Sequence, residues 1–210
     1  MPDPADQLMA LGAATLGEAG GRPMSPRVRA VWPAARLAAP GFAVRCTPGD
    51  NLAVHVAVAR APVGSALAVD VGIQRELGYW GEVLTTAACA RGIAGLVIDG
   101  CVRDTAALEA DGFPVFSTGV ALRGATKELP GTVGARAEVG DVLVQTGDWL
   151  VCDADGVTII AAAQLDDVLA AGTARAEREQ AMFAALRDGR TTMELLDLDP
   201  TPIDEGEDAE

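Results

Sequence analysis

Hydrophobic positions along this chain form two patterns that alternate from about residue 40 onward. Four apolar runs have the length of buried strands and are bounded by turns rich in Gly, Pro or Asp: residues 41–47, 66–72, 93–98 and 113–116. Three segments between them have the composition of helices: residues 52–59, 82–91 and 103–111. Strands that alternate with helices in this way predict an α/β domain.

Both ends of the chain extend this pattern. Residues 5–19 are compatible with a helix that Gly20, Gly21 and Pro23 bring to an end. After a Gly-rich loop at residues 119–127, we expect short strands separated by Gly or Asp turns at residues 132–139, 141–145, 149–152 and 157–160, and then a long amphipathic helix at residues 164–186. We therefore predict one domain over residues 1–198. Residues 199–210 form an acidic tail with too few apolar residues to fold.

The charge of the chain argues against nucleic acid as a partner. Of 210 residues, 30 are acidic and 16 are Lys or Arg, which gives a net charge of −14. Such a chain repels phosphate backbones, and its 4% aromatic content offers little surface for base stacking. The acidic end is expected to aid solubility or, alternatively, to contact a basic partner. A basic stretch near the start is expected at the solvated surface or against a neighbouring subunit, and it contains Arg22, Arg27, Arg29 and Arg36.

The cysteines and the single histidine do not form a zinc-binding pattern. No two cysteines are spaced as Cys-x-x-Cys, and Cys101 is expected to be a small packing residue. His55 lies among Val and Ala in the predicted helix 52–59, which favours a hydrogen-bonded core or interface residue, and Asn51 is a candidate cap for that helix. There is no signal-like segment and no membrane-spanning apolar stretch, so we expect a cytoplasmic protein with reduced thiols.

Residues 78–104 combine groups suited to a small anion and a metal ion. The strand 93–98 leads through the Asp99–Gly100 turn to Arg103 and Asp104, at the strand end where open α/β sheets bind ligands. The helix that begins at Glu82 is expected at the same edge, where its free N–H groups favour a carboxylate. Oxygen ligands of this kind suit a hard cation such as Mg²⁺.

Spacing alone leaves plainer interpretations of these residues open. Glu82 and Asp104 have the positions of ordinary acids in the first turn of a helix. Arg103 can equally form a surface ion pair with Asp99 or Glu109. Asp70, near the end of another predicted strand, can support a metal site or simply face solvent.

Several separated motifs decide between these interpretations by resemblance. Glu82 is followed after twenty residues by Arg103-Asp104, and the flanking motifs read GYWGEVL, ARG, VIDG and VRD. Upstream and downstream lie TPGDNLAVHVAV and GDWLVCDADGVTII. Together they resemble the RraA-like family, over residues 8–196, which includes class II 4-hydroxy-4-methyl-2-oxoglutarate aldolases. The aldolases have Asp where this chain has Glu82.

The resemblance implies a fold, an assembly and roles for individual residues. The fold is an α/β/α swivelling-domain type with a mixed central sheet, assembled as a homotrimer or hexamer with the active site between subunits. Asp104 holds Mg²⁺ or Mn²⁺, Arg103 binds the 2-oxo acid, and Glu82 orients water at the metal. Backbone N–H groups for pyruvate come from Gly81, Val83 and Leu84. A glutamate of the neighbouring subunit completes the site, and Glu179 matches its position, with Glu177 as the alternative.

The implied activity is that of a divalent-metal-dependent lyase. It cleaves 4-hydroxy-4-methyl-2-oxoglutarate and similar 2-oxo acids to pyruvate by a retro-aldol reaction and decarboxylates oxaloacetate, because both reactions give the pyruvate enolate. Two alternatives stay open. One is a lyase for a different 2-oxo acid, and the other is a regulator that binds and inhibits an endoribonuclease, as some family members do.

Overall fold

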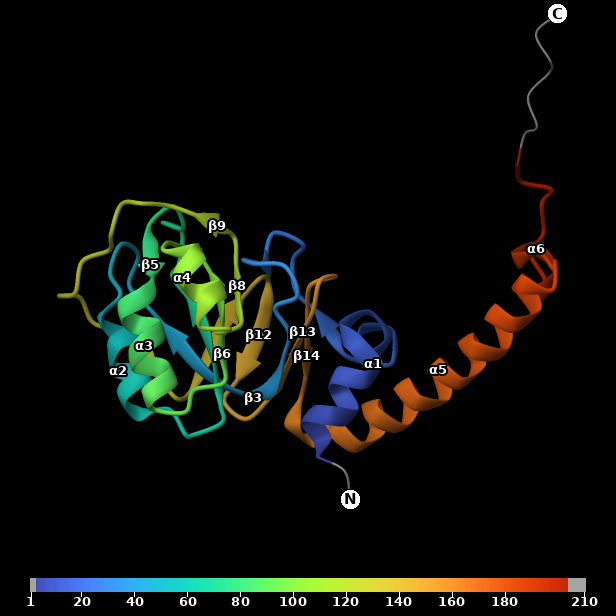
Figure 1. Ribbon diagram of the computed structural model, residues 1–210, viewed down its shortest axis with the longest axis horizontal. Helices are drawn as coiled ribbons and strands as arrows, with labels where there is room; N and C mark the ends of the chain where they lie inside the picture. Colours follow the sequence, from blue (N-terminus) through green and yellow to red (C-terminus); the bar gives the residue numbers. More distant parts are fainter. Residues whose placement is uncertain (1–2, 204–210) are drawn as a thin grey trace, which may run out of the picture.

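Four parallel strands form the centre of the sheet in the computed structural model, which describes residues 3–203 (Figure 1). They lie in the order β3 (Leu37–Arg45), β4 (Ala66–Asp70), β6 (Gly95–Asp99) and β8 (Val115–Ser117). Antiparallel strands complete the nine-stranded sheet: β13 (Trp149–Cys152), β14 (Val157–Ile160) and β1 (Arg22–Pro23) beyond β3, β2 (Arg29–Ala30) beyond β8, and β10 (Thr132–Val133) on β3. The predicted α/β fold with a mixed sheet is confirmed.

Helices cover one face of this sheet because they connect its parallel strands. These helices are α2 (Leu52–Arg60), α3 (Glu82–Ala90) and α4 (Thr105–Ala110), and with the sheet they enclose the largest apolar core (Figure 1). On the other face, the hairpin of β11 (Arg136–Val139) and β12 (Val142–Gln145) closes a second apolar cluster. Each strand run and helix predicted between residues 41 and 116 is present, with ends shifted by a few residues.

A third cluster joins the two ends of the chain. The helix α1 (Pro4–Glu18) packs on β13 and β14 and on the beginning of α5 (Leu165–Arg187), which follows the short turn η1 (Ala162–Gln164). Leu165, Val168 and Leu169 take part in this packing. Beyond that start, α5 projects away from the sheet and ends near α6 (Thr192–Leu195) (Figure 1). Only Val168 and Gly172 of α5 are buried, so most of this helix is not covered by other parts of residues 3–203.

The predicted apolar stripe of the long helix therefore divides into two parts. Its first part packs in the third cluster, whereas Met182, Phe183 and Leu186 in its second part belong to no core cluster within residues 3–203. None of the helices in that range combines the length and the apolar character of a membrane-spanning segment. Residues 199–203 form a turn, and the rest of the predicted tail lies outside the described residues, so its disorder stays a prediction.

A small parallel sheet lies at the carboxyl ends of the parallel strands of the main sheet. It consists of β5 (Gly78–Trp80), β7 (Cys101–Val102) and β9 (Gly119–Val120), and each of these strands follows one parallel strand of the main sheet. The sequence predicted a helix over residues 103–111, and its start lies two residues later in the structure. Cys101 and Val102 pair with two neighbouring strands, so α4 begins only at Thr105.

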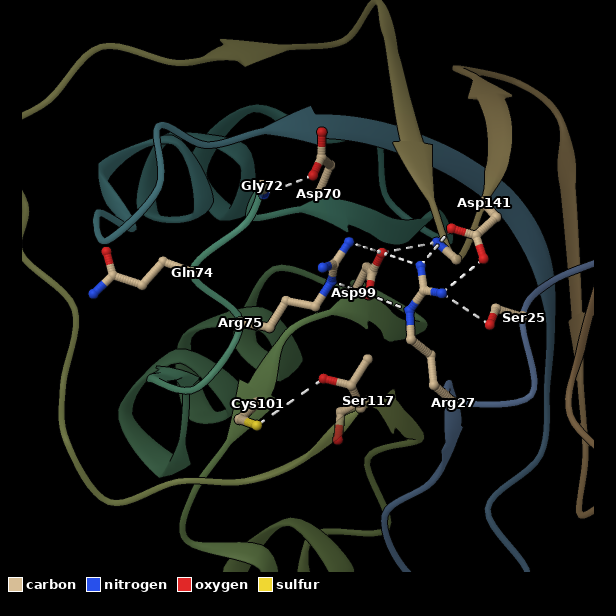
Figure 2. A network of polar contacts seen from close by, with 12 residues as sticks. Ser25, Arg27, Asp70, Gly72, Gln74, Arg75, Asp99, Cys101, Ser117 and Asp141 are labelled. Atoms are coloured by element: carbon tan, nitrogen blue, oxygen red, sulfur yellow. Dashed lines mark hydrogen bonds and ion pairs between the residues drawn. The ribbon is translucent and has the colours of Figure 1, made fainter.

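Asp99 connects the segments around this edge (Figure 2). Its side chain is 3% exposed, and its two oxygens accept hydrogen bonds from the guanidinium groups of Arg27, at 3.0 and 2.8 Å, and Arg75, at 2.8 and 3.2 Å. Arg27 also pairs with Asp141 in the turn between β11 and β12, at 2.7 Å. Burial alone raises the pKa of Asp99, but the two arginines outweigh burial and lower it. The expectation that Arg27 is simply solvated was therefore wrong, and the alternative in which Arg103 pairs with Asp99 is ruled out because Asp99 binds Arg27 and Arg75.

Substituting the two carboxylates that bind Arg27 should have very unequal effects on stability. Asp99→Asn should lower the free energy of unfolding by about 3 kcal/mol, because it leaves two guanidinium groups without their shared buried anion. Asp141→Asn is the matched control and should cost far less, because Asp141 is 66% exposed. Urea denaturation of both variants measures the difference.

The same pair predicts a dependence on pH. The folded pKa of Asp99 is lowered, so its contribution is present above about pH 4 and is lost as the pH falls toward the folded value. Wild type should therefore lose more stability on acidification than Asp99→Asn. Equal acid sensitivity in the two proteins would contradict a stabilising role for the ionised Asp99.

Candidate functional site

Strand pairing brings the start of α3 and the residues before α4 together. In the parallel pair of β5 and β7, Trp80 lies opposite Val102, and the N–H of Arg103 donates to the carbonyl of Trp80 at 2.9 Å. Gly81 and Glu82 directly follow β5, and Arg103 and Asp104 directly follow β7. The structure therefore places the N-terminus of α3 beside the Arg-Asp pair, as the sequence pattern predicted.

Asp104 lies at this junction in an unusual backbone conformation. Its φ of 57° is in the left-handed region, which Asp tolerates better than most residues. It precedes α4 but makes no side-chain cap for that helix. Instead, its Oδ2 accepts a hydrogen bond from the N–H of Glu82 at 3.1 Å, and Arg103 Nε lies 3.7 Å away. Asp104 is therefore not an ordinary first-turn acid of α4: its carboxylate faces the positive end of α3.

Gly81 makes this approach possible because it has no side chain. A Cβ on Gly81 would clash with Asp104 Oδ2 and would lie 3.1 Å from Arg103 Cγ. The φ of −168° is ordinary extended backbone, so space and not conformation requires glycine here. Any larger residue at position 81 must displace the Asp104 carboxylate.

A cavity of about 220 Å³ opens at this junction. Its walls include five of the residues that the sequence singled out: Gly81, Val83, Leu84, Arg103 and Asp104. The side chain of Glu82, between them in sequence, is not part of the wall, and Glu82 is exposed. The remaining wall comes from β5, from the start of α2 and from the loop after β9, and it contains Asn51, His55, Gly78, Tyr79, Trp80, Gly124, Ala125 and Lys127.

Asn51, His55 and Lys127 are the functional candidates that the sequence did not identify. His55 lies on the side of α2 that faces the cavity, so the preferred interpretation as a core or interface histidine was incomplete. Asn51 does not cap α2: its amide donates to the carbonyl of Tyr79 at 2.8 Å, and Asp50 Oδ1 accepts from the N–H of Leu52 instead. The only sequence signal was the motif that carries both residues, TPGDNLAVHVAV.

The donor set at Asp104 suits a hydrated cation and not a protein cage. Within residues 3–203, no group of three or more His, Cys, Asp or Glu side chains is arranged to hold a metal ion. Asp104 offers one carboxylate whose side chain is 42% exposed. Mg²⁺ is commonly bound through one or two carboxylates and keeps several waters, so one carboxylate at an open cavity fits Mg²⁺ and does not fit zinc.

Two further glutamates lie away from this cavity. Glu179 of α5 forms an ion pair with Arg175 at 2.9 Å, and Arg175 also pairs with Glu18 of α1. Neither Glu179 nor Glu177 lines the cavity of its own chain.

Cys101 and Asp70 have structural contacts. Cys101 is buried with its Sγ 4.0 Å from Thr118 Oγ1, in keeping with a packing role. The Asp70 carboxylate accepts a hydrogen bond from the N–H of Gly72 at 2.7 Å.

Comparison with known proteins identifies the family. A profile of the RraA-like family, described as Aldolase/RraA, matches residues 5–159. A protein of Halalkalibacterium halodurans named "Putative 4-hydroxy-4-methyl-2-oxoglutarate aldolase" is 32% identical over 153 residues, which cover 73% of this chain and 73% of that protein.

Solved structures show the same fold. A protein from Pseudomonas syringae pv. tomato has a TM-score of 0.81 and 26% identity, with 90% of both chains covered. The RNA-processing inhibitor RraA from Thermus thermophilis has a TM-score of 0.64 and 26% identity, with 70% of this chain and 91% of that chain covered. The chain therefore belongs to the RraA-like family, whose members similar to it include both a named aldolase and an RNA-processing inhibitor.

Proposed function

We propose that this protein is a divalent-metal-dependent carbon–carbon lyase. It cleaves 4-hydroxy-4-methyl-2-oxoglutarate and similar 2-oxo acids to pyruvate and decarboxylates oxaloacetate. The observation that carries the proposal is the Asp104 carboxylate, fixed on the N-terminus of α3 beside Arg103 in a cavity. Two relatives that are 32% and 34% identical to this chain carry aldolase names, which supports the same reaction class.

In this proposal Asp104 holds Mg²⁺ or Mn²⁺. The ion supplies Lewis-acid stabilisation of the negative charge that develops on the 2-oxo group when the bond at C3 breaks. Arg103 binds the carboxylate or carbonyl oxygen of the same 2-oxo acid through its planar guanidinium. Glu82, exposed at the start of α3, orients water beside the ion.

The first turn of α3 binds the substrate carboxylate. The first N–H groups of a helix have no partner within the helix, and Gly81, Val83 and Leu84 line the cavity there. The N–H of Glu82 is already bound to Asp104, so the neighbouring N–H groups serve the substrate. Arg103 also lies where it can steady the water that exchanges a proton with C3.

We further propose that the active protein is a homotrimer or hexamer in which Glu179 serves a neighbouring cavity. Two observations support this assembly. The helix α5, which contains Glu179, projects away from the sheet (Figure 1). Met182, Phe183 and Leu186, near the end of this helix, pack in no core cluster within residues 3–203. Glu177 on the same helix is the alternative to Glu179 as the residue that serves the neighbouring cavity.

A second candidate function is inhibition of an RNA-processing enzyme by protein contact. The similarity to the inhibitor from Thermus thermophilis favours it, and the acidic charge suits a basic partner. Decarboxylation of oxaloacetate by the purified protein with Mg²⁺ separates the two functions. A rate equal to the metal-only background would favour the inhibitor.

Altering the Asp104 carboxylate or the Arg103 guanidinium should greatly slow turnover. Asp104→Ala and Arg103→Lys should each lower kcat for oxaloacetate by about 100-fold or more, since one loses the metal ligand and the other the two-pronged carboxylate contact. Asp104→Ala should cost about 1–2 kcal/mol of stability, measured by urea denaturation, because the left-handed backbone at this position suits Asp better than Ala. EDTA should abolish wild-type activity and added Mg²⁺ should restore it, whereas full activity in EDTA would refute the metal mechanism.

Adding one methyl group beside Asp104 should impair the enzyme without removing any functional group. Gly81→Ala should lower kcat/KM about tenfold or more, because the Cβ displaces the carboxylate from the N–H of Glu82. Cys89→Ala, at an exposed position of the same helix outside the cavity, is the control and should keep wild-type kinetics. Equal activity of the two variants would mean that the position of Asp104 is not critical.

Mixed oligomers test the contribution of Glu179. Glu179→Ala and Asp104→Ala chains should each be inactive alone, and co-expression should restore activity, because some interfaces then combine an intact Asp104 with an intact Glu179. Native mass spectrometry confirms the mixing. Inactive mixed oligomers would place the whole site within one chain, and full activity of Glu179→Ala alone would direct attention to Glu177.

A further inference from the structure

The first turn of α3, which faces the cavity, lacks the usual support of a helix start. Its N-cap residue, Gly81, has no side chain that could accept a hydrogen bond from the turn. The N–H of Glu82 donates to the Asp104 carboxylate. The N–H groups of Val83 and Leu84 have no hydrogen-bond partner within residues 3–203. An ordinary capping side chain would occupy one of these two groups, so this turn needs a different support if both are to stay free.

A buried hydrogen bond on the core side of the turn supplies this support. Nε1 of Trp80 donates to Oγ1 of Thr85 at 2.7 Å, and both residues are buried. The N–H of Thr85 in turn donates to the carbonyl of Gly81 at 3.1 Å. Together the two bonds enclose residues 81–84, and three of these four residues line the cavity.

The indole of Trp80 is itself fixed by the core. Its ring stacks on that of Phe113, with the ring centroids 5.8 Å apart and an angle of 8° between the ring planes. The carbonyl of Phe113 accepts a hydrogen bond from Nε1 of Trp32 at 3.0 Å, which fixes Phe113 in turn. The backbone carbonyl of Trp80 accepts from the N–H of Arg103 at 2.9 Å. Trp80 therefore connects the first turn of α3 both to the core and to the backbone of Arg103.

We infer that Trp80 and Thr85 are positioning residues for the first turn of α3. The inference rests on the proposed function, in which this turn binds the substrate carboxylate. The bond between the two side chains takes the place of a capping side chain. It holds the turn in one geometry from the buried side and leaves the N–H groups of Val83 and Leu84 free for the ligand. Thr85 is buried and does not line the cavity, so it acts only through the backbone of the turn.

The place of this bond in the fold distinguishes it from an ordinary contact in the core. A buried indole N–H needs an acceptor, and many backbone or side-chain oxygens could serve. Here the acceptor belongs to the turn whose N–H groups line the cavity. Thr158 offers the comparison: it is equally buried, and its Oγ1 donates to the carbonyl of Ala13 at 2.9 Å, but it joins β14 to α1 and does not line the cavity.

The first test removes the acceptor and keeps the shape of the side chain. Thr85→Val should raise KM for oxaloacetate about 10-fold and leave kcat within about threefold of wild type, because the turn contacts a carboxylate that substrate and transition state share. Calorimetry should show a similar loss in the affinity for pyruvate in Mg²⁺. Thr85→Ser retains the hydroxyl and should keep the wild-type values. Thr158→Val is the matched control: both valine variants should lower Tm by about 2–6 °C, but Thr158→Val should leave KM unchanged.

A double-mutant cycle tests whether the bond itself is responsible. Trp80→Phe removes the indole N–H and keeps an aromatic ring against Phe113, and it should also raise KM about 10-fold. The double variant with Thr85→Val should stay within about twofold of either single variant, because both changes remove the same bond. The assignment would be overturned by a wild-type KM in Thr85→Val, by an equal rise of KM in Thr158→Val, or by a double variant whose effect is the product of the two single effects.

Hydrogen exchange separates a failure of this inference from a failure of the proposed function. In protein without substrate, followed by NMR, the backbone amide protons of residues 82 and 85 should exchange at least about 10-fold faster in Thr85→Val than in wild type. Thr85→Ser and Thr158→Val should keep the wild-type rates there. This difference in a protein without lyase activity would refute the proposed reaction and retain the positioning of the turn. Unchanged exchange in Thr85→Val would refute the positioning role, whatever the activity.

Discussion

The hydrogen bond between the Glu82 N–H and the Asp104 carboxylate is the contact on which the whole site depends. It requires three separate features of the chain. The pairing of β5 with β7 brings the two segments together, Gly81 leaves room for the carboxylate, and the left-handed backbone of Asp104 turns the side chain toward α3 and away from α4. The positive end of α3 then stabilises the carboxylate before any metal or substrate arrives. Arg103 is placed by the same pairing, so Asp104 and Arg103 are held in a fixed relation to each other.

The network around Asp99 supports this arrangement from below. Arg75, which binds Asp99, lies in the segment between β4 and β5, and its carbonyl accepts the N–H of Cys101 at 2.9 Å. One buried carboxylate therefore ties the strand β6, the approach to β5 and the turn before β12 to the same point (Figure 2). Its desolvation is compensated by two guanidinium groups, which makes the network sensitive to the loss of Asp99 and tolerant of changes at its exposed rim. The network therefore fixes the segments that lead into β5 and β7, the two strands that Gly81 and Arg103 follow.

The two ends of the cavity differ in how they are prepared. At the Arg103 end, the charged side chains of Arg103 and Asp104 are partly exposed to solvent. At the α2 end, Asp50 and the carbonyl of Tyr79 accept hydrogen bonds from other groups of the wall, which hold Asn51 and the residues on both sides of Lys127. Oδ1 of Asn51 and Nε2 of His55 have no hydrogen-bond partner among residues 3–203. The projecting α5 adds a third element, since its glutamates lie outside the cavity of their own chain.

The sequence by itself determined the main strands and helices. Apolar runs and helical spacing are local properties, and in a layered fold the apolar positions are the ones that become buried. It also determined that the start of α3 and Arg103-Asp104 share an edge, since that follows from the order of strand, turn and helix. Only the tertiary structure decided the rest. Strands of two or three residues such as β7 have no pattern of their own and exist because neighbours pair with them. In the sequence, His55 lies among Val and Ala. It lines the cavity because the loop of Lys127, more than seventy residues further along the chain and bound by Asp50, forms the facing part of the wall. Contacts between remote segments are set by the packing of the whole domain, and no local pattern encodes them.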